Sequence, residues 1–225
     1  MAENAQDLQN IYQRRFAETA AYRNLVWREL AAIFFNRWVR PEDAVLDLGC
    51  GYGEFINNIR AKKKWAMDLN PDAPRHLAGE VVFFHQDCSS PWPLPGGSLD
   101  AVFTSNFFEH LPDKECLKRT LRQIMLCLKP GRRILALGPN IKYLPGRYWD
   151  FFDHHVALTE LSLAEALEVE GFALEQVTPR FLPYTMVNSP QYPLFFLRLY
   201  LMFPTLWWIR GRQFLVIARK PAKTA

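Results

Sequence analysis

The stretch VLDLGCGYGEF, from Val45 to Phe55, constrains the fold more than any other part of the sequence. An apolar strand runs directly into a loop with glycine at Gly49, Gly51 and Gly53. Because glycine has no Cβ atom, it allows a tight turn and a close approach between the backbone and another group. Packing explains the apolar residues but not Asp47 near the strand end. The stretch therefore predicts a strand, a ligand-holding loop and a helix.

Strand and helix signals alternate along the rest of the chain. After a first helix over about 7–39, strands are expected at 44–48, 64–70, 80–87, 99–106, 132–140, 173–182 and 212–220. Helices are expected at 54–60, 113–131 and 158–172. In the last helix, Thr159 is the expected N-cap and Gly171 the C-terminal cap. Such alternation is typical of an α/β fold, a doubly wound open parallel sheet with helices on both faces.

The same alternation predicts a single domain over residues 1–225. Its parts are a helical N-terminal cap (1–40), a ligand-binding core (44–180), an aromatic insert between the last two strands (183–211) and a final strand (212–220).

The composition argues against several functional and structural classes for this chain. The net charge of +4 is modest for a nucleic-acid binder, and only RAKKK, Arg60–Lys64, is a dense basic cluster. The four cysteines form no CxxC pair, so neither a zinc site nor a disulfide scaffold is expected, and no metal is assigned. We expect a reduced, cytoplasmic protein without a signal peptide or an ordinary membrane span.

The charges of the glycine loop narrow the choice of ligand. A dinucleotide fingerprint has a third glycine where this chain has Glu54. The carboxylates of Asp47 and Glu54 repel a pyrophosphate but not a cation. The loop thus disfavours a nicotinamide oxidoreductase.

VLDLGCGYG resembles motif I of the class I S-adenosylmethionine-dependent methyltransferases, whose cofactor carries a sulfonium and an ammonium group. The resemblance covers Ala44 to about Gly171 plus the final strand, and it implies a mostly parallel seven-stranded sheet of the Rossmann-like type. It also implies S-adenosylmethionine as cofactor and S-adenosylhomocysteine as product. A fainter resemblance is to small bacterial methyltransferases of polysaccharide or glycolipid biosynthesis.

The resemblance assigns roles at the ends of the strands. Asp47 orients the loop and the methionine amine, Asp68 accepts from the ribose hydroxyls, and Leu69 lies against the adenine. Asp87 accepts from the adenine amino group, and Arg23 of the first helix meets the cofactor carboxylate. The whole expected cofactor set is Arg23, Asp47, Gly49, Cys50, Gly51, Gly53, Asp68, Leu69, Asp87, Cys88, Ser105, Asn106 and His110.

The loop GRYWDFFDHHVALTE after the fifth strand is the candidate acceptor site, because it follows the strand beside the expected methyl position. His154 or His155 is a candidate base, held by Asp153 or Asp150, and Tyr148 is a further catalytic candidate. The alternative is that this loop is an aromatic plug whose histidines bond to the backbone.

The segment 192–209 has seven aromatic residues among eighteen, with one charge, Arg198. It can be a lid over the site, a homodimer interface, or a peripheral contact with a membrane. The sequence therefore favours a methyltransferase for a small or lipid-linked acceptor. Oxygen is the expected methylated atom, with carbon and nitrogen as the other options. The alternatives are an RNA methyltransferase and a non-catalytic cofactor-binding module that holds a partner.

Overall fold

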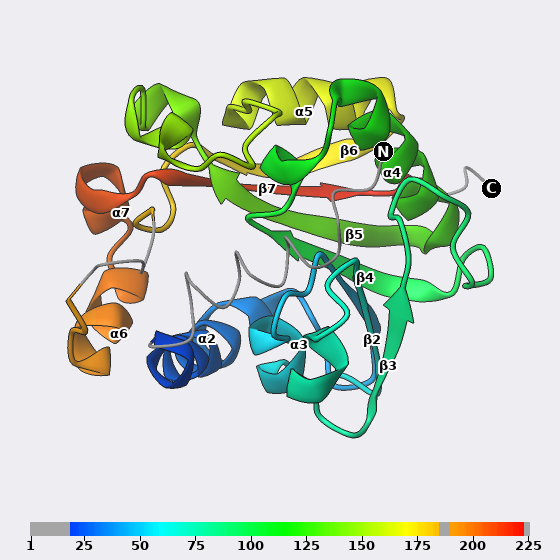
Figure 1. Ribbon diagram of the computed structural model, residues 1–225, viewed down its shortest axis with the longest axis horizontal. Helices are drawn as coiled ribbons and strands as arrows, with labels where there is room; N and C mark the ends of the chain where they lie inside the picture. Colours follow the sequence, from blue (N-terminus) through cyan, green and yellow to red (C-terminus); the bar gives the residue numbers. More distant parts are fainter. Residues whose placement is uncertain (1–18, 185–189, 223–225) are drawn as a thin grey trace.

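The computed structural model describes residues 19–184 and 190–222. Its centre is one seven-stranded sheet of order β3-β2-β1-β4-β5-β7-β6, drawn in Figure 1. The strands from β3 to β5 pair in parallel, and β7 runs antiparallel to both of its neighbours. The prediction of a doubly wound, mostly parallel seven-stranded sheet is confirmed.

The element bounds follow the alternation of the sequence. The strands are β1 (Ala44–Leu48), β2 (Lys63–Asp68), β3 (Val81–His85), β4 (Leu99–Ser105), β5 (Leu128–Pro139), β6 (Ala173–Thr178) and β7 (Gln213–Arg219). The α-helices are α2 (Ala20–Ile33), α3 (Glu54–Asn58), α4 (Lys114–Cys127), α5 (Glu160–Val169), α6 (Leu194–Met202) and α7 (Pro204–Arg210). Short 3₁₀ helices are η2 (Phe35–Arg37), η3 (Ala73–His76), η4 (Phe108–His110), η5 (Ile141–Tyr143) and η6 (Arg147–Asp150).

Successive residues of the central strands face opposite sides of the sheet and build two separate cores. In β5, Ile134 and Ala136 belong to the core beneath α4 and α5, whereas Leu135 and Leu137 belong to the core beneath α2 and α3. Figure 1 shows these two helix pairs on opposite sides of the sheet. The apolar strands therefore need helices on both faces, as the sequence predicts.

Several predicted boundaries differ from the structure by one to four residues; the expected strand 173–182, for example, ends at Thr178, and the junction of α4 with β5 is also displaced. The helix expected to reach residue 131 ends at Cys127, and the strand expected from residue 132 begins at Leu128. The cause is Pro130, which lacks a donor for a helix interior and pushes Lys129 toward an extended conformation. The first expected helix is described only as α2 and η2, and its part before residue 19 lies outside the described residues.

Both expected caps of α5 are present. The Thr159 side chain accepts from the backbone N–H of Ser162, and the Ser162 hydroxyl accepts from the N–H of Thr159 in return. Gly171 has a φ of 88°, the left-handed conformation that ends a helix. These local signals fix where the chain leaves the loop after β5 and enters the helix.

The aromatic insert forms α6 and α7, which stand at one end of the sheet beside α2 (Figure 1). Residues 185–189 of the insert lie outside the described part of the chain. Within the described ranges, no helix combines the length and the apolar character needed to cross a bilayer. The proposed division of the chain into domain segments stays a prediction.

Candidate functional site

The glycine loop between β1 and α3 has the backbone that its sequence predicts. Gly49, Gly51 and Gly53 all have positive φ, at 69°, 53° and 73°. A Cβ atom at Gly49 would stand 2.3 Å from the ring of Phe107, which follows β4. The loop therefore needs glycine both for its conformation and for its close approach to the next strand end.

Three carboxylates gather around this loop. Burial raises the pKa of Asp47 well above its ordinary value, and the negative charges of Glu54 and Asp68 raise it further. Burial also raises the pKa of Asp68, against hydrogen bonds from backbone N–H groups that lower it. Burial makes the largest contribution to the raised pKa of the Cys50 thiol, and the negative charges of the same three acids raise it further. A site of this kind stabilises a cation and repels a phosphate.

One cation already reaches the cluster from the first described helix. An Arg23 guanidinium nitrogen lies 2.9 Å from a Glu54 carboxylate oxygen, with both side chains largely buried. The contact brings α2 to the N-terminus of α3, beside the glycine loop. Arg23 is thus located at the expected site, and its predicted contact with the cofactor carboxylate stays a prediction.

Asp68, at the end of β2, organises the neighbouring backbone. Its two carboxylate oxygens accept from the N–H groups of Gly51 and Asn70, both at 2.8 Å. Leu69 beside it is 44% exposed. The pair offers an acidic acceptor and an apolar surface side by side, which suits a ribose and an adenine.

The end of β3 contributes one side chain, that of Asp87, that can reach a ligand. Asp87 is exposed, and its carboxylate accepts from the Ser89 N–H at 2.7 Å. The next residue, Cys88, is buried, with its sulfur 3.2 Å from the Thr120 hydroxyl. Asp87 can therefore reach a ligand with its side chain, whereas Cys88 can do so only through its backbone.

The end of β4 carries a strained residue. Asn106 has a φ of 50°, the only positive φ of a residue other than glycine in the described chain. Its side-chain amide donates to the Ser105 hydroxyl at 2.9 Å, and its N–H donates to the Leu137 carbonyl. A strained backbone persists only where the surrounding structure holds it in place. Such residues are concentrated at functional sites.

A second titratable cluster lies immediately after Asn106, on η4. Burial raises the pKa of Glu109 to about 7, with His110 opposing the rise. Burial disfavours the charged ring of His110, yet the carboxylates of Asp153 and Glu109 raise its pKa above the ordinary value. Nδ1 of His110 lies 3.2 Å from a carboxylate oxygen of Asp153. Two adjacent groups thus have pKa values raised above their ordinary values.

The loop after β5 docks onto η4. The N–H groups of His155 and Val156 both donate to the Glu109 carbonyl, at 2.8 and 3.1 Å. His154 is buried, with its ring centroid 4.9 Å from that of His110, whereas the His155 side chain is exposed. Tyr148 is fully buried, and its hydroxyl donates to the Val156 carbonyl at 2.6 Å.

These placements separate the three predicted catalytic residues. His154 joins the cluster of Glu109 and His110, while Tyr148 holds the loop and has its hydroxyl engaged by the backbone. The Asp153 carboxylate pairs with His110, a partner that the sequence analysis did not propose. Their catalytic roles stay predictions.

Glu109 is the residue that sequence reasoning missed. Its signal was present in the adjacent Glu and His of FFEHL, but nothing in a sequence shows that the glutamate is the one buried.

Two groups within the described residues have donors close enough to hold a metal ion. Ligand atoms of Glu109, His110 and His154 lie within 4.8 Å of one another, and so do those of Asp87, Cys88 and Cys116. The expectation of no metal stays a prediction.

The comparisons with known proteins agree with this geometry. A family model described as a methyltransferase domain matches residues 13–177, well over half of the chain. The chain belongs to the methyltransferase domain family. Membership and relatives together identify S-adenosylmethionine as the cofactor, and the glycine loop with its three acids fits that cationic group.

Two curated relatives are methyltransferases of known or assigned type. The chain is 30% identical over 111 residues to the 27-O-demethylrifamycin SV methyltransferase of Amycolatopsis mediterranei, covering 44% of this chain and 39% of the relative. It is 29% identical over 137 residues to a protein of Mycolicibacterium smegmatis named as a probable S-adenosylmethionine-dependent methyltransferase, covering 58% and 52%. This methyltransferase domain thus matches only about half, or less, of the length of either relative.

Among solved structures, the domain resembles an S-adenosylmethionine-dependent methyltransferase from Archaeoglobus fulgidus. The TM-score is 0.65 at 24% identity, over 91% of this chain and 99% of the other. At that identity the likeness supports the fold.

Proposed function

We propose that this methyltransferase domain transfers a methyl group from S-adenosylmethionine to an oxygen of a small or lipid-linked acceptor. The observation that carries the proposal is the set of three carboxylates at the glycine loop, Asp47, Glu54 and Asp68, whose mutual repulsion a cationic ligand relieves. A bound cation reduces the electrostatic cost of holding these three acids close together. This reduction adds to the affinity for the cation.

The domain's own residues divide the work between binding and proton transfer. S-adenosylmethionine supplies a methyl group bonded to a sulfonium. Asp68 and Leu69 hold the nucleoside, while Arg23, Asp47 and the glycine loop hold the methionine part. Methyl transfer is a direct displacement, so alignment of acceptor and methyl supplies much of the acceleration.

An acceptor hydroxyl also has to lose a proton, and the cluster on η4 can take it. In the proposal His154 receives the proton as the new carbon–oxygen bond forms. Glu109 then shares the charge, since its pKa of about 7 suits exchange at neutral pH. Asp153 holds the neighbouring His110 ring in place. Tyr148 positions the loop through its bond to the Val156 carbonyl.

The acceptor class is supported by the surroundings of the site. The loop after β5 exposes Trp149 and Phe152, and the insert that follows is apolar. These surfaces suit an acceptor with an apolar part. An RNA acceptor would need a basic track, and the sequence carries none beyond Arg60–Lys64.

Calorimetry tests the cofactor, and isotope transfer tests the reaction. S-adenosylhomocysteine should bind and NADH should not. With methyl-labelled S-adenosylmethionine, label should enter a bacterial lipid extract or an aqueous metabolite extract as an alkali-stable ether. Cofactor binding without any transfer to either extract would favour the non-catalytic module.

Three loop variants test the assignment of roles. His154→Ala should lower turnover most, Tyr148→Phe should lower it less, and His155→Ala least, because its ring is exposed. Affinity for S-adenosylhomocysteine should stay within about threefold in all three, a change below about 1 kcal/mol. Full activity in all three variants would remove the loop from the acceptor site.

A further inference from the structure

The α6–α7 hairpin, residues 194–210, carries its apolar side chains on the outside. Met202, Trp208 and Ile209 are 64%, 60% and 65% exposed. Large exposed apolar side chains of the hairpin and its approach are Tyr192, Phe195, Phe196, Leu199, Met202, Phe203, Trp208 and Ile209. We call this set the apolar patch. A concentration of large exposed apolar side chains on one short segment is a feature of interaction surfaces.

The inner face of the hairpin is well anchored, so the exposure does not come from a loosely placed segment. Two nitrogens of Arg198 donate to the two carboxylate oxygens of Glu29 on α2, at 2.8 and 2.9 Å. Leu201 is buried, and the Trp207 ring stands edge-on to Phe181 at 4.9 Å. The one charged residue within α6 thus faces the domain's own α2, and apolar residues face outward, the reverse of an ordinary surface helix.

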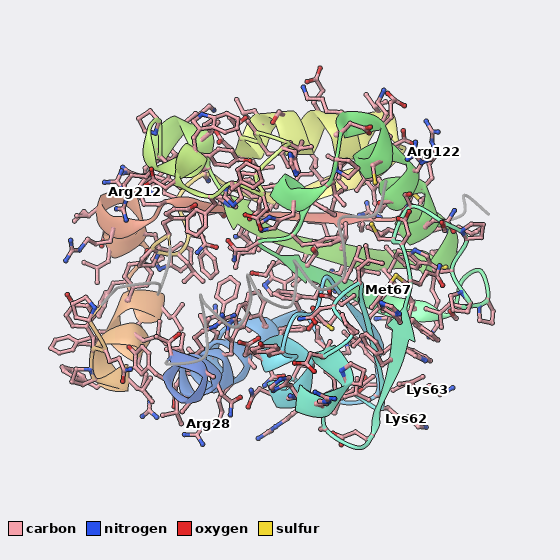
Figure 2. The ribbon with its side chains drawn as sticks, viewed as in Figure 1. Arg28, Lys62, Lys63, Met67, Arg122 and Arg212 are labelled. Atoms are coloured by element: carbon pink, nitrogen blue, oxygen red, sulfur yellow. The ribbon has the colours of Figure 1, made fainter. Side chains whose placement is uncertain are left out.

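The surroundings of the apolar patch are positively charged. The sequence contains no aspartate or glutamate after Glu175. Arg210 ends α7, and Arg37 lies over the ring of Phe34, which itself contacts Trp207. Figure 2 labels Arg212 beside α7 and Arg28 on the outer side of α2. An apolar face rimmed by arginines, rich in tryptophan, tyrosine and phenylalanine, complements an anionic lipid surface.

The charge pattern also argues against a second copy of the chain as the occupant. A two-fold interface presents the same patch from both sides, so each arginine rim would meet a rim of the same sign. The insert carries no carboxylate to neutralise it. A membrane with anionic headgroups supplies the missing negative charge.

The apolar patch lies at the same edge of the sheet as the functional site. Gln213, the first residue of β7 after α7, pairs with Pro139 at the carboxyl end of β5. That edge also holds the glycine loop after β1 and the loop after β5. A surface bound by the hairpin would therefore face the side on which an acceptor enters.

We propose that the α6–α7 hairpin docks this protein on the surface of anionic membranes, with the apolar patch inserted among the headgroups and the arginines on lipid phosphates. The proposal is independent of the atom methylated. It requires only that the hairpin contacts the membrane and that negatively charged lipid attracts the protein.

Vesicle co-sedimentation tests it with the whole chain. The protein should sediment with vesicles of phosphatidylglycerol and phosphatidylcholine, and about tenfold less with phosphatidylcholine alone. Raising the salt should weaken the binding several-fold, since surface charges become screened. Trp208→Ser with Ile209→Ser should reduce binding by about tenfold or more, because two apolar side chains leave the interface.

A matched control replaces exposed apolar residues of the opposite helical layer. Leu126→Ser with Val169→Ser, on α4 and α5, should leave vesicle binding unchanged. A second test variant, Arg37→Gln with Arg210→Gln, removes charge without touching the apolar patch, and should lower binding to anionic vesicles alone. This variant keeps the test decisive if the serine variant folds poorly. Circular dichroism and the affinity for S-adenosylhomocysteine report whether each variant is folded.

Three results would overturn the proposal. The first is no sedimentation of the wild type with anionic vesicles at low salt. The second is equal binding by the wild type and both test variants. The third is a wild-type dimer in light scattering that Trp208→Ser with Ile209→Ser converts to a monomer, which makes the apolar patch an interface between copies.

Discussion

Glu109→Gln should change the pH dependence of stability in a defined direction. Burial raises the pKa of this carboxyl from 4.5 to about 7 in the folded protein. The folded state therefore holds a proton that the unfolded state releases between these two values. The stabilisation is complete below about pH 4.5 and is lost as the pH rises through about 7.

The size of the effect follows from the shift. Each pKa unit is worth about 1.4 kcal/mol, so a rise from 4.5 to about 7 corresponds to about 3 kcal/mol of unfolding free energy. The wild type should lose about that amount between mildly acidic and mildly alkaline pH through this group alone. Glutamine has no proton to lose, and the Glu109 carbonyl that holds the loop is unchanged in the variant.

Urea unfolding followed by circular dichroism measures the difference. The free-energy curves of wild type and Glu109→Gln should converge below about pH 4.5 and be furthest apart above about pH 7, where the variant is more stable by up to about 3 kcal/mol. Glu165→Gln, which removes an exposed carboxylate from α5, is the matched control and should parallel the wild type. Parallel curves for Glu109→Gln as well would show that its carboxyl is not held protonated by burial.

Three further substitutions test the site and the frame around it. Asp68→Ala should weaken S-adenosylhomocysteine binding in calorimetry by about 1–3 kcal/mol, since a charged acceptor is lost; unchanged affinity would remove the ribose assignment. Gly49→Ala should cost at least about 1–2 kcal/mol in urea unfolding from its positive φ alone, with the contact to Phe107 adding more; a stable variant would show that the loop relaxes. Thr159→Ala should lower stability by about 1 kcal/mol by removing the cap that pairs with Ser162, and an unchanged urea midpoint would count against the capping role.

Local signals in the sequence predicted most of the frame. The individual strands, the glycine loop and the cap at Thr159 depend on residues close together in the chain, and such residues report local backbone geometry directly. The pairing of His110 with Asp153 joins residues 43 positions apart, so no local pattern reveals it. Likewise, Tyr148 reads as a loop tyrosine with a free hydroxyl, and only tertiary packing shows that the backbone engages it.

The composition of the insert indicates that its apolar residues must be shielded from water. It does not indicate which of them are buried against the rest of the domain. Trp207 and Trp208 are neighbours in sequence, yet one packs against Phe181 and the other faces outward. A sequence cannot distinguish them because the helix phase is set by contacts with α2 and the chain before the insert.

The position of β7 has a consequence for how the chain is made. This strand lies between β5 and β6, although it follows both in sequence. During synthesis, β5 therefore presents an unpaired edge, and β6 has no place in the sheet until residues 213–219 have left the ribosome. The apolar hairpin emerges in that same interval. Chains stopped shortly before β7 should thus need chaperone protection, whereas the completed chain closes its own sheet.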